Sequence, residues 1–245
     1  MSQHQQTIFT DHKGDSVIAI DGVHATLMAK ESSACSHDLK ALCEAFYDAA
    51  ICKDPNVIVN LIQTSRRDGT SVYTILTDVV PAVARMLGEA WEDDLISFVA
   101  NTLGCIRLQS VVLGLPNDKK KPVINSAISN QSVLVMVPKG GQHTLGATVL
   151  AKQIRLYGID VKLELEASDA SLSEMALTQN FDAVMISASK GLSVSNLRQL
   201  VAQARRKWKT AKIIIGGGIL DHGIDLVTAT GTDYVTNDWQ GALGL

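Results

Sequence analysis

The segment VLVMVPKGGQHTLG, residues 133–146, decides the fold. It opens with five consecutive apolar residues rich in valine, a pattern typical of a strand that is buried on both faces. Gly140 and Gly141 then interrupt the run, and helical spacing begins at Thr144 and continues to Tyr157. A buried strand that leads directly into a helix is the repeating unit of a parallel α/β sheet.

The same alternation continues to the C-terminus. Further strands are predicted at residues 161–165, 183–186, 213–215 and 234–235, and helices at 168–178, 193–207 and 219–229. Five strands that alternate with helices predict a flavodoxin-like (Rossmann-like), doubly wound parallel sheet of order 2-1-3-4-5 over residues 131–245.

The first half of the chain has helical periodicity instead. Ser36 has the character of an N-cap, and Leu39, Leu42, Cys43, Phe46 and Ala50 follow it at helical spacing. Pro55 suits the first turn of a second helix, a third is predicted at residues 71–87 with a kink at Pro81, and a fourth at 95–113. Short connections predict an up-and-down four-helix bundle over residues 31–116.

The remaining segments are polar. Residues 1–30 are predicted to be a flexible N-terminal extension, and residues 117–130, which begin NDKKKP, a linker. The four cysteines have no C-x-x-C spacing, and the chain lacks a signal peptide and any apolar run long enough for a membrane span. We therefore expect a reduced, cytoplasmic protein that does not associate with membranes.

The charge balance bears on nucleic acids. The formal net charge is −3, whereas broad, nonspecific DNA binding needs a basic face. The one basic cluster, residues 205–209, is better interpreted as the solvated C-terminal end of a helix, where cations complement the helix dipole. Direct DNA contact is therefore not expected.

Small residues follow three of the predicted strands. In a doubly wound sheet the ligand lies beyond the carboxyl ends of the strands, where the strand order reverses. The first strand is followed by His143 and Gly146, the third by Ser187-Ala188-Ser189 and the fourth by Gly216-Gly217. A lone histidine, a Ser-x-Ser or a Gly-Gly each has an ordinary structural explanation, but together they predict an open trough with one good metal ligand, His143.

This combination resembles the cobalamin-binding signature D-x-H-x-x-G … S-x-L … G-G. The resemblance implies cobalamin bound base-off, with His143 as the lower axial ligand of cobalt and the tail buried in the trough. The residues implied to contact it are His143, Thr144, Leu145, Gly146, Ser187, Ala188, Ser189, Gly216 and Gly217, together with Tyr234 and Thr236 of the closing TGTDYVTNDWQGAL segment. Two positions depart from the signature, because Gly141 replaces its aspartate and Ser189 its leucine.

Residues 86–98 resemble the G-x-x-W-x-x-x-x-I-S segment of the helical cap that precedes cobalamin domains. The resemblance implies that Trp91, Ser97 and Phe98 lie over the upper face of the corrin. Light-responsive repressors have a Glu-His pair where this chain has Asn101 and Thr102. We therefore expect the upper face to favour a small ligand, as in hydroxo- or aquocobalamin, over an adenosyl group.

Residues 91–109 also resemble a narrower group, the AerR/PpaA family of photosynthesis-gene antirepressors. Membership implies a cobalamin-binding, light- or redox-responsive regulator whose partner is a DNA-binding transcriptional repressor. Three alternatives stay open: a corrinoid methyl carrier of a methyltransferase system, a haem-binding sensor of the same fold, and a cofactor-free interaction module. No acid/base pair or activated nucleophile can be identified, so we do not expect an enzyme.

Overall fold

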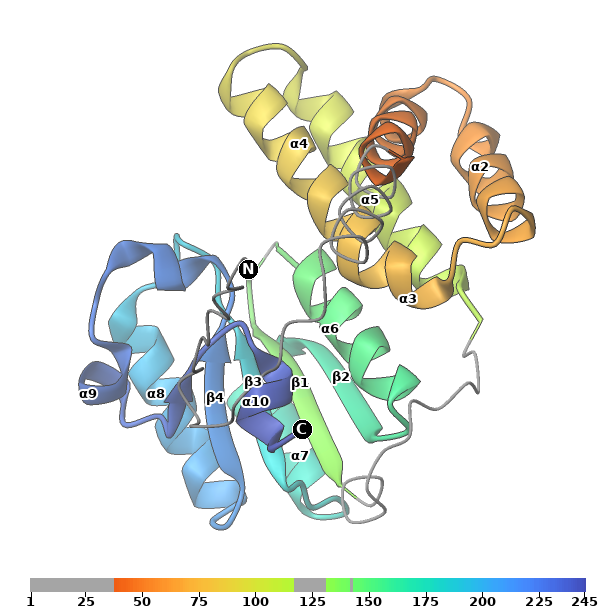
Figure 1. Cartoon of the computed structure of the whole chain (residues 1–245). Helices are drawn as coiled ribbons and strands as arrows, with labels where there is room; N and C mark the ends of the chain where they lie inside the picture. The colour runs from red at the N-terminus through yellow and green to blue at the C-terminus, as the bar shows by residue number, and fades with distance from the viewer. Residues whose placement is uncertain (1–37, 117–130, 142) are drawn as a thin grey trace, which may run out of the picture.

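A computed structural model describes residues 38–116, 131–141 and 143–245 of the chain (Figure 1). The predicted N-terminal extension, the N-cap at Ser36 and the predicted linker at 117–130 lie outside the described residues. Within them, no helix combines the length and the apolar character that a membrane crossing requires.

The C-terminal half is a five-stranded, entirely parallel sheet of order β2-β1-β3-β4-β5, as predicted. The strands are β1 (Ser132–Pro138), β2 (Asp160–Ala167), β3 (Ala183–Ser187), β4 (Lys212–Gly216) and β5 (Tyr234–Val235). β1 lies between β2 and β3, and its five central residues are all buried, which explains the continuous apolar run (Figure 1).

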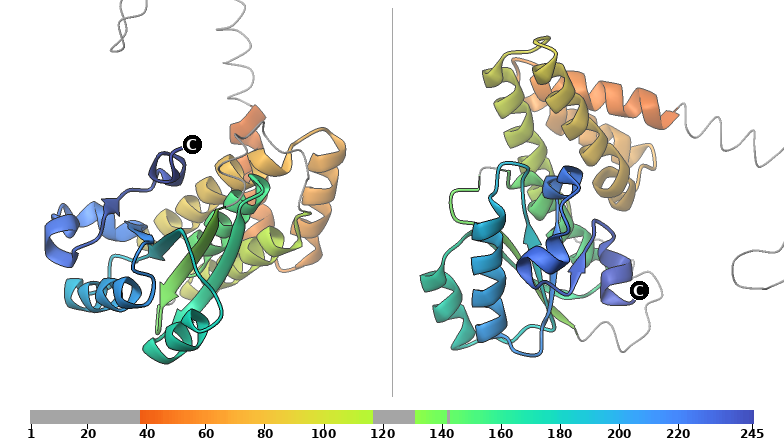
Figure 2. Two further views of the ribbon diagram at one scale, coloured as in Figure 1. Left: turned by 90° about the horizontal axis from the view of Figure 1, so that it is seen from below. Right: turned by 90° about the vertical axis from the view of Figure 1, so that its left-hand side faces the viewer.

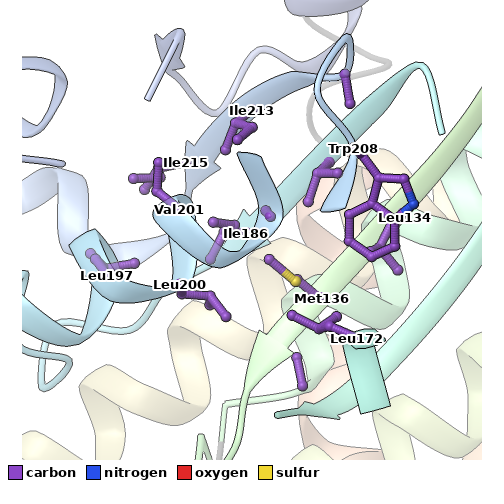
Figure 3. Close-up of a cluster of buried hydrophobic side chains, with 14 of the residues drawn as sticks. Leu134, Met136, Leu172, Ile186, Leu197, Leu200, Val201, Trp208, Ile213 and Ile215 are labelled. Atoms are coloured by element: carbon purple, nitrogen blue, oxygen red, sulfur yellow. The ribbon is translucent and has the colours of Figure 1, made fainter. Parts of the chain in front are cut away.

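The two faces of the sheet are covered by different helices. Leu134 and Met136 of β1 pack with α7 (Asp169–Ala176) and α8 (Val194–Lys207), and Figure 3 shows this cluster around Leu172, Leu197 and Trp208. The alternate residues Val133, Val135 and Val137 pack with α6 (Leu145–Leu156) and α10 (Trp239–Leu243). Each face is therefore closed by a layer of helices, as a doubly wound sheet requires.

One predicted helix is wrong in this half. The segment 219–229 is not a single helix but a 3₁₀ turn, η2 (Gly218–His222), followed by α9 (Leu226–Thr230). Gly223 separates the two with a left-handed φ of 65°, a conformation that ends a helix.

The N-terminal part is helical, and Figure 2 shows it as a separate layer beside the sheet. It comprises helical residues 38–51, α2 (Asn56–Arg67), a continuous run of α3 (Val72–Thr74), η1 (Ile75–Val79) and α4 (Val80–Glu92), and finally α5 (Phe98–Gly114). Phe46, Leu76, Leu87 and Leu108 are fully buried at its centre. We refer to these helices as the cap.

The prediction that the fourth helix starts at Leu95 is wrong. Asp94 has a left-handed φ of 57°, and the Leu95 N–H donates back to the Ala90 carbonyl over 2.8 Å, so residues 94 and 95 close α4. α5 begins only at Phe98, because the Ser97 hydroxyl accepts a hydrogen bond from the Ala100 N–H at 3.2 Å.

Pro81 changes the third helix, although not by a simple kink. The turn before it, η1, is a π-helix in which the Val80 N–H donates to the Ile75 carbonyl. The Leu76 carbonyl therefore lacks the Val80 N–H that an α-helix would give it, and Pro81, the next residue, has no N–H to replace it. It accepts instead a 2.9 Å hydrogen bond from the Gln153 side chain of α6.

α6 therefore belongs to both halves of the protein. Lys152, which is buried, donates from Nζ to the Leu115 carbonyl at the end of α5 over 2.6 Å. Val149 and Leu156 are part of the cap core, whereas Ala147, Ala151 and Ile154 pack under the sheet. The cap is consequently fixed to the sheet through one shared helix.

Candidate functional site

A cavity of about 870 Å³ lies between the cap and the carboxyl ends of the strands. This volume is near the upper end of the range for small-molecule and cofactor sites. Its lining comes from α4 (Val80, Pro81, Ala84, Trp91), α5 (Phe98, Asn101, Thr102, Cys105, Ile106, Gln109), α6 and the two residues before it (His143, Thr144, Leu145, Gly146, Val149, Leu150, Gln153), the ends of β3, β4 and β5 with the residues that follow them (Met185, Ile186, Ser187, Ile214, Gly216, Gly217, Thr236, Asn237), and α10 (Trp239).

The floor at β4 requires glycine. A Cβ on Gly216 would lie 2.9 Å from the Thr236 carbonyl oxygen, and one on Gly217 would lie 2.5 Å from the Ala188 carbonyl oxygen. Gly217 also has a φ of 100°, which side chains other than glycine rarely adopt. The Gly217 N–H donates to Asn237 Oδ1 over 2.7 Å, so this loop is held rigidly below the cavity.

The floor at α6 uses glycine for a different reason. A Cβ added to Gly146 would meet nothing within 4 Å, and Gly146 lines the cavity. The missing side chain at Gly146 keeps the cavity open, whereas the backbone conformation at this position does not require glycine.

His143 is exposed and lines the cavity directly before α6. It also lines a small neighbouring pocket of about 20 Å³ together with Ser187, Ser189 and Gly141. Among the described residues, no group of three or more His, Cys, Asp or Glu side chains could hold a metal ion. His143 thus lines the cavity without belonging to such a group.

Gly141, which replaces the aspartate of the signature, is itself sterically constrained. A Cβ there would lie 2.7 Å from Val137 Cγ1 and 2.9 Å from the Pro138 carbonyl oxygen. The loop conformation in this chain therefore excludes the aspartate, and His143 lacks the carboxylate that would orient its ring.

The roof of the cavity is formed by two aromatic rings and one face of α5. Trp91 and Phe98 pack edge to face with ring centroids 6.2 Å apart. Behind them Asn101, Thr102 and Cys105 recur at helical spacing along the cavity side of α5. Burial raises the pKa of the Cys105 thiol, so it stays protonated at neutral pH.

Polar contacts join this roof to the floor. The Thr144 hydroxyl donates to Gln109 Oε1 over 3.2 Å, and Gln109 Nε2 donates to the Thr148 hydroxyl over 3.3 Å. Gln109 and Thr144 both line the cavity, so the contact between α5 and α6 forms part of its wall.

The C-terminal helix completes the wall through Trp239. Its ring packs edge to face on Tyr157, at a centroid distance of 5.1 Å, and the Tyr157 hydroxyl accepts from Gln240 Nε2 over 2.6 Å. Burial and the hydroxyl of Tyr73 raise the pKa of Tyr157 to about 12. Tyr157 therefore stays neutral and anchors α10 to α6.

Of the fourteen residues predicted for the site, ten line the cavity: Trp91, Phe98, His143, Thr144, Leu145, Gly146, Ser187, Gly216, Gly217 and Thr236. Four do not. Ser97 caps α5, Ala188 is buried behind the floor, Ser189 lines only the small pocket, and the ring of Tyr234 lies beside the Lys212 ammonium.

Sequence reasoning missed Cys105, Gln109, Gln153, Asn237 and Trp239 as lining residues. Helical spacing from Phe98 through Asn101 and Thr102 would have indicated Cys105 and Gln109. The other three depend on how the cap and α10 meet the sheet, which no local pattern reports.

The basic cluster at residues 205–209 is engaged within the fold. Arg205 pairs with Asp233 at 2.8 Å and Lys207 with Asp169 at 2.6 Å. Trp208 is buried against Phe181, and its ring N–H donates to the Gln179 carbonyl. The aromatic residue of this cluster is therefore unavailable to stack on a nucleobase.

Comparisons with known proteins agree with this architecture. Residues 131–240 match the model of the B12 binding domain family. The chain is 32% identical over 168 residues to an uncharacterized 20.5 kDa protein in the bchF-crtJ intergenic region of Rhodobacter capsulatus, covering 68% of this chain and 87% of that protein.

One solved structure shows the same fold. The monomethylamine corrinoid protein of Methanosarcina barkeri superposes with a TM-score of 0.63 at 14% identity, over 84% of this chain and 96% of that one. A cobalamin-binding protein of Desulfitobacterium hafniense is 14% identical over 84% of this chain and 95% of that one, with a TM-score of 0.39.

Proposed function

Because the chain belongs to the AerR/PpaA family of B12-binding-domain proteins, we propose that it is a cobalamin-binding regulator that acts as an antirepressor of photosynthesis genes. In this proposal it has no catalytic activity of its own. It works in the cytoplasm, and its partner is a DNA-binding repressor.

The observation that supports cobalamin binding most strongly is the cavity itself. A macrocycle needs a wide, flat space above the strand ends, and residues without bulk line it there: Gly146, Gly216 and Gly217. At Gly216 and Gly217 a Cβ would collide with a neighbouring backbone carbonyl oxygen, whereas at Gly146 the missing side chain only leaves the space open. Bound cobalamin would supply a cobalt centre whose axial ligands respond to light and redox state.

His143 is the residue that we propose for the lower axial position. It lines the cavity and has no carboxylate partner in the signature position, because Gly141 cannot carry a side chain there. The ring is then held less firmly than in sites where a carboxylate accepts a hydrogen bond from the histidine, so we expect the bond from His143 to be exchangeable.

The roof supports a small upper ligand. Trp91 and Phe98 pack against each other at its edge, and Asn101, Thr102 and Cys105 form the surface behind them. We propose that these side chains crowd the upper face of a bound corrin, so that the hydroxo or aquo form is the preferred cofactor. Comparable affinities for hydroxo- and adenosylcobalamin in the dark would contradict this preference.

A signal from the cavity would leave through α5 and α6. Both helices line it, and Gln109 bonds them to each other through Thr144 and Thr148. A ligand shifts a protein between two arrangements only by its differential affinity for them. In our proposal, occupancy of the cavity changes the packing of α5 on α6, and the repressor reads the cap surface that results.

The test is a DNA-binding assay with a repressor of photosynthesis genes from the same host on its operator. We expect the protein loaded with hydroxocobalamin to release the repressor from DNA at lower concentrations than the cofactor-free protein. Protein alone, without repressor, should leave the operator fragment unshifted. Equal release by loaded and cofactor-free protein would contradict cobalamin control, and no release by either would contradict the antirepressor role.

A further inference from the structure

α5 carries apolar side chains on three sides. Arg107 is the one charged residue among its 17 positions, and this side chain is used internally on the Ala50 and Cys52 carbonyls. One face, with Leu108, Val111 and Val112, is buried in the cap core, and a second lines the cavity. An amphipathic helix needs only one apolar stripe, so the third face of α5 calls for an explanation.

That third face carries a regular stripe, which we call the α5 seam. It consists of Val99, Leu103, Ile106, Ser110 and Leu113, spaced alternately by four and three residues. Ile106 lies where this face meets the cavity face, because it also lines the cavity. The four apolar members are 63, 45, 53 and 63% exposed. This spacing is that of a coiled-coil seam, and it extends for about 21 Å along the helix. A contiguous exposed apolar stripe marks an interaction site.

The two ends of the α5 seam carry opposite charge. Glu92, Asp93 and Asp94 are exposed just before its N-terminal end, and no lysine or arginine occurs between Arg85 and Arg107. At the C-terminal end of the seam, two arginines of α2, Arg66 and Arg67, line a groove that Gly114 and Leu115 at the end of α5 also line. One acidic residue, Asp68, comes directly after these arginines in the sequence. The surface is thus acidic at one end and basic at the other.

We propose that the α5 seam joins two copies of this chain in an antiparallel, twofold-symmetric dimer. Antiparallel pairing sets the acidic end of each seam against the basic end of the other, whereas parallel pairing would oppose carboxylates to carboxylates. The helix dipoles favour the same direction. A surface that carries both charges and one apolar stripe is complementary to itself, as an isologous interface must be.

The groove beside the seam adds to the contact. It has a volume of about 660 Å³, runs between α2 and α5, and has apolar walls that include Ile58, Val59 and Ile62. In the antiparallel arrangement the turn between α4 and α5 of the partner copy, where Leu95 is 76% exposed, approaches this groove. Ile106 is the one seam residue that also lines the cavity, so the inference does not rest on cobalamin binding there.

Sedimentation of the full chain between about 1 and 500 µM tests the proposal, because a helix pair of this length gives a small interface and roughly micromolar affinity. We expect a monomer–dimer equilibrium that Leu103→Glu weakens at least roughly tenfold, the effect of losing about 1.4 kcal/mol. Leu177→Glu, at an 85% exposed leucine next to α7, is the matched control and should leave it unchanged.

Charge reversal tests the direction of pairing. Asp93→Lys and Arg67→Glu should each weaken the dimer, and the double variant should restore it, since the opposed ends are then complementary again. A monomer throughout the concentration range would overturn the proposal. So would a dimer insensitive to Leu103→Glu, a dimer strengthened by Asp93→Lys alone, or a double variant as weak as the single ones.

Discussion

Gly146 and Gly217 belong to the same signature, yet the structure assigns them opposite physical roles. Gly217 is needed by the backbone, because its φ is 100° and the Ala188 carbonyl oxygen would lie 2.5 Å from a Cβ. Gly146 is in a helix, where any residue is allowed, and its missing side chain only keeps the cavity open. Stability and ligand binding can therefore be separated at these two positions.

Gly217→Ala should lower the free energy of unfolding by about 3 kcal/mol, since it adds strain in a region of φ and ψ that is reserved for glycine. Gly146→Leu should leave it within about 0.5 kcal/mol of the original and yet reduce cobalamin affinity roughly tenfold or more. Urea unfolding and equilibrium dialysis measure the two effects. Normal cobalamin binding by a folded Gly146→Leu variant would exclude this cavity as the site.

His143→Ala should weaken cobalamin retention or shift the visible spectrum of the bound cofactor, because the variant removes the nitrogen ligand proposed for cobalt. Lys139→Ala, an exposed position in the same loop, is the control and should change neither. If the His143→Ala spectrum and affinity both match those of the original protein, His143 is not an axial ligand, and burial in the cavity alone must account for binding.

At the scale of elements, the π-helical turn before Pro81 shows where local prediction ends. The sequence predicts a distortion at Pro81, because proline removes a hydrogen-bond donor from the helix. It does not say that the orphaned Leu76 carbonyl will be satisfied by Gln153, which follows it by 77 residues. That pairing exists only because the cap packs on α6.

Gln153→Ala should destabilise the protein by about 1–2 kcal/mol, the cost of leaving a partly buried carbonyl without a donor. In a Pro81→Ala background the cost should be smaller, since residue 81 then has an N–H to offer to this turn. A double-mutant cycle by urea denaturation measures the coupling. Strictly additive effects would show that the two residues do not serve the same carbonyl.

The elements that the sequence predicts well are those whose signal is local. The predicted bounds of each strand lie within two residues of the observed ones, because buried parallel strands are continuous apolar runs. The start of α5 was misplaced, because Leu95 and Ile96 fit the helical period although Asp94 ends α4 and Ser97 caps α5. The helix predicted at 219–229 failed at Gly223, whose left-handed φ divides it.

At the scale of the whole molecule, α6 decides how the two halves act together. It contributes to the cap core through Val149 and Leu156, to the sheet through Ile154, and to the cavity through Leu145 and Gly146. The strand-end half of the site was predictable, because parallel strands bring their carboxyl ends to one edge. The remainder of the site, including Gln153 and Trp239, depends on packing between segments distant in sequence.

The measurement that tests the central claim most directly is a visible absorption spectrum of the protein, recorded after it is mixed with hydroxocobalamin or, separately, with haemin and then desalted. The account predicts cobalamin bands in stoichiometric amount from the original protein and much weaker bands from Gly146→Leu. Retention of haemin alone would contradict the identity of the cofactor. Retention of neither would contradict cofactor binding and leave the domain as an interaction module.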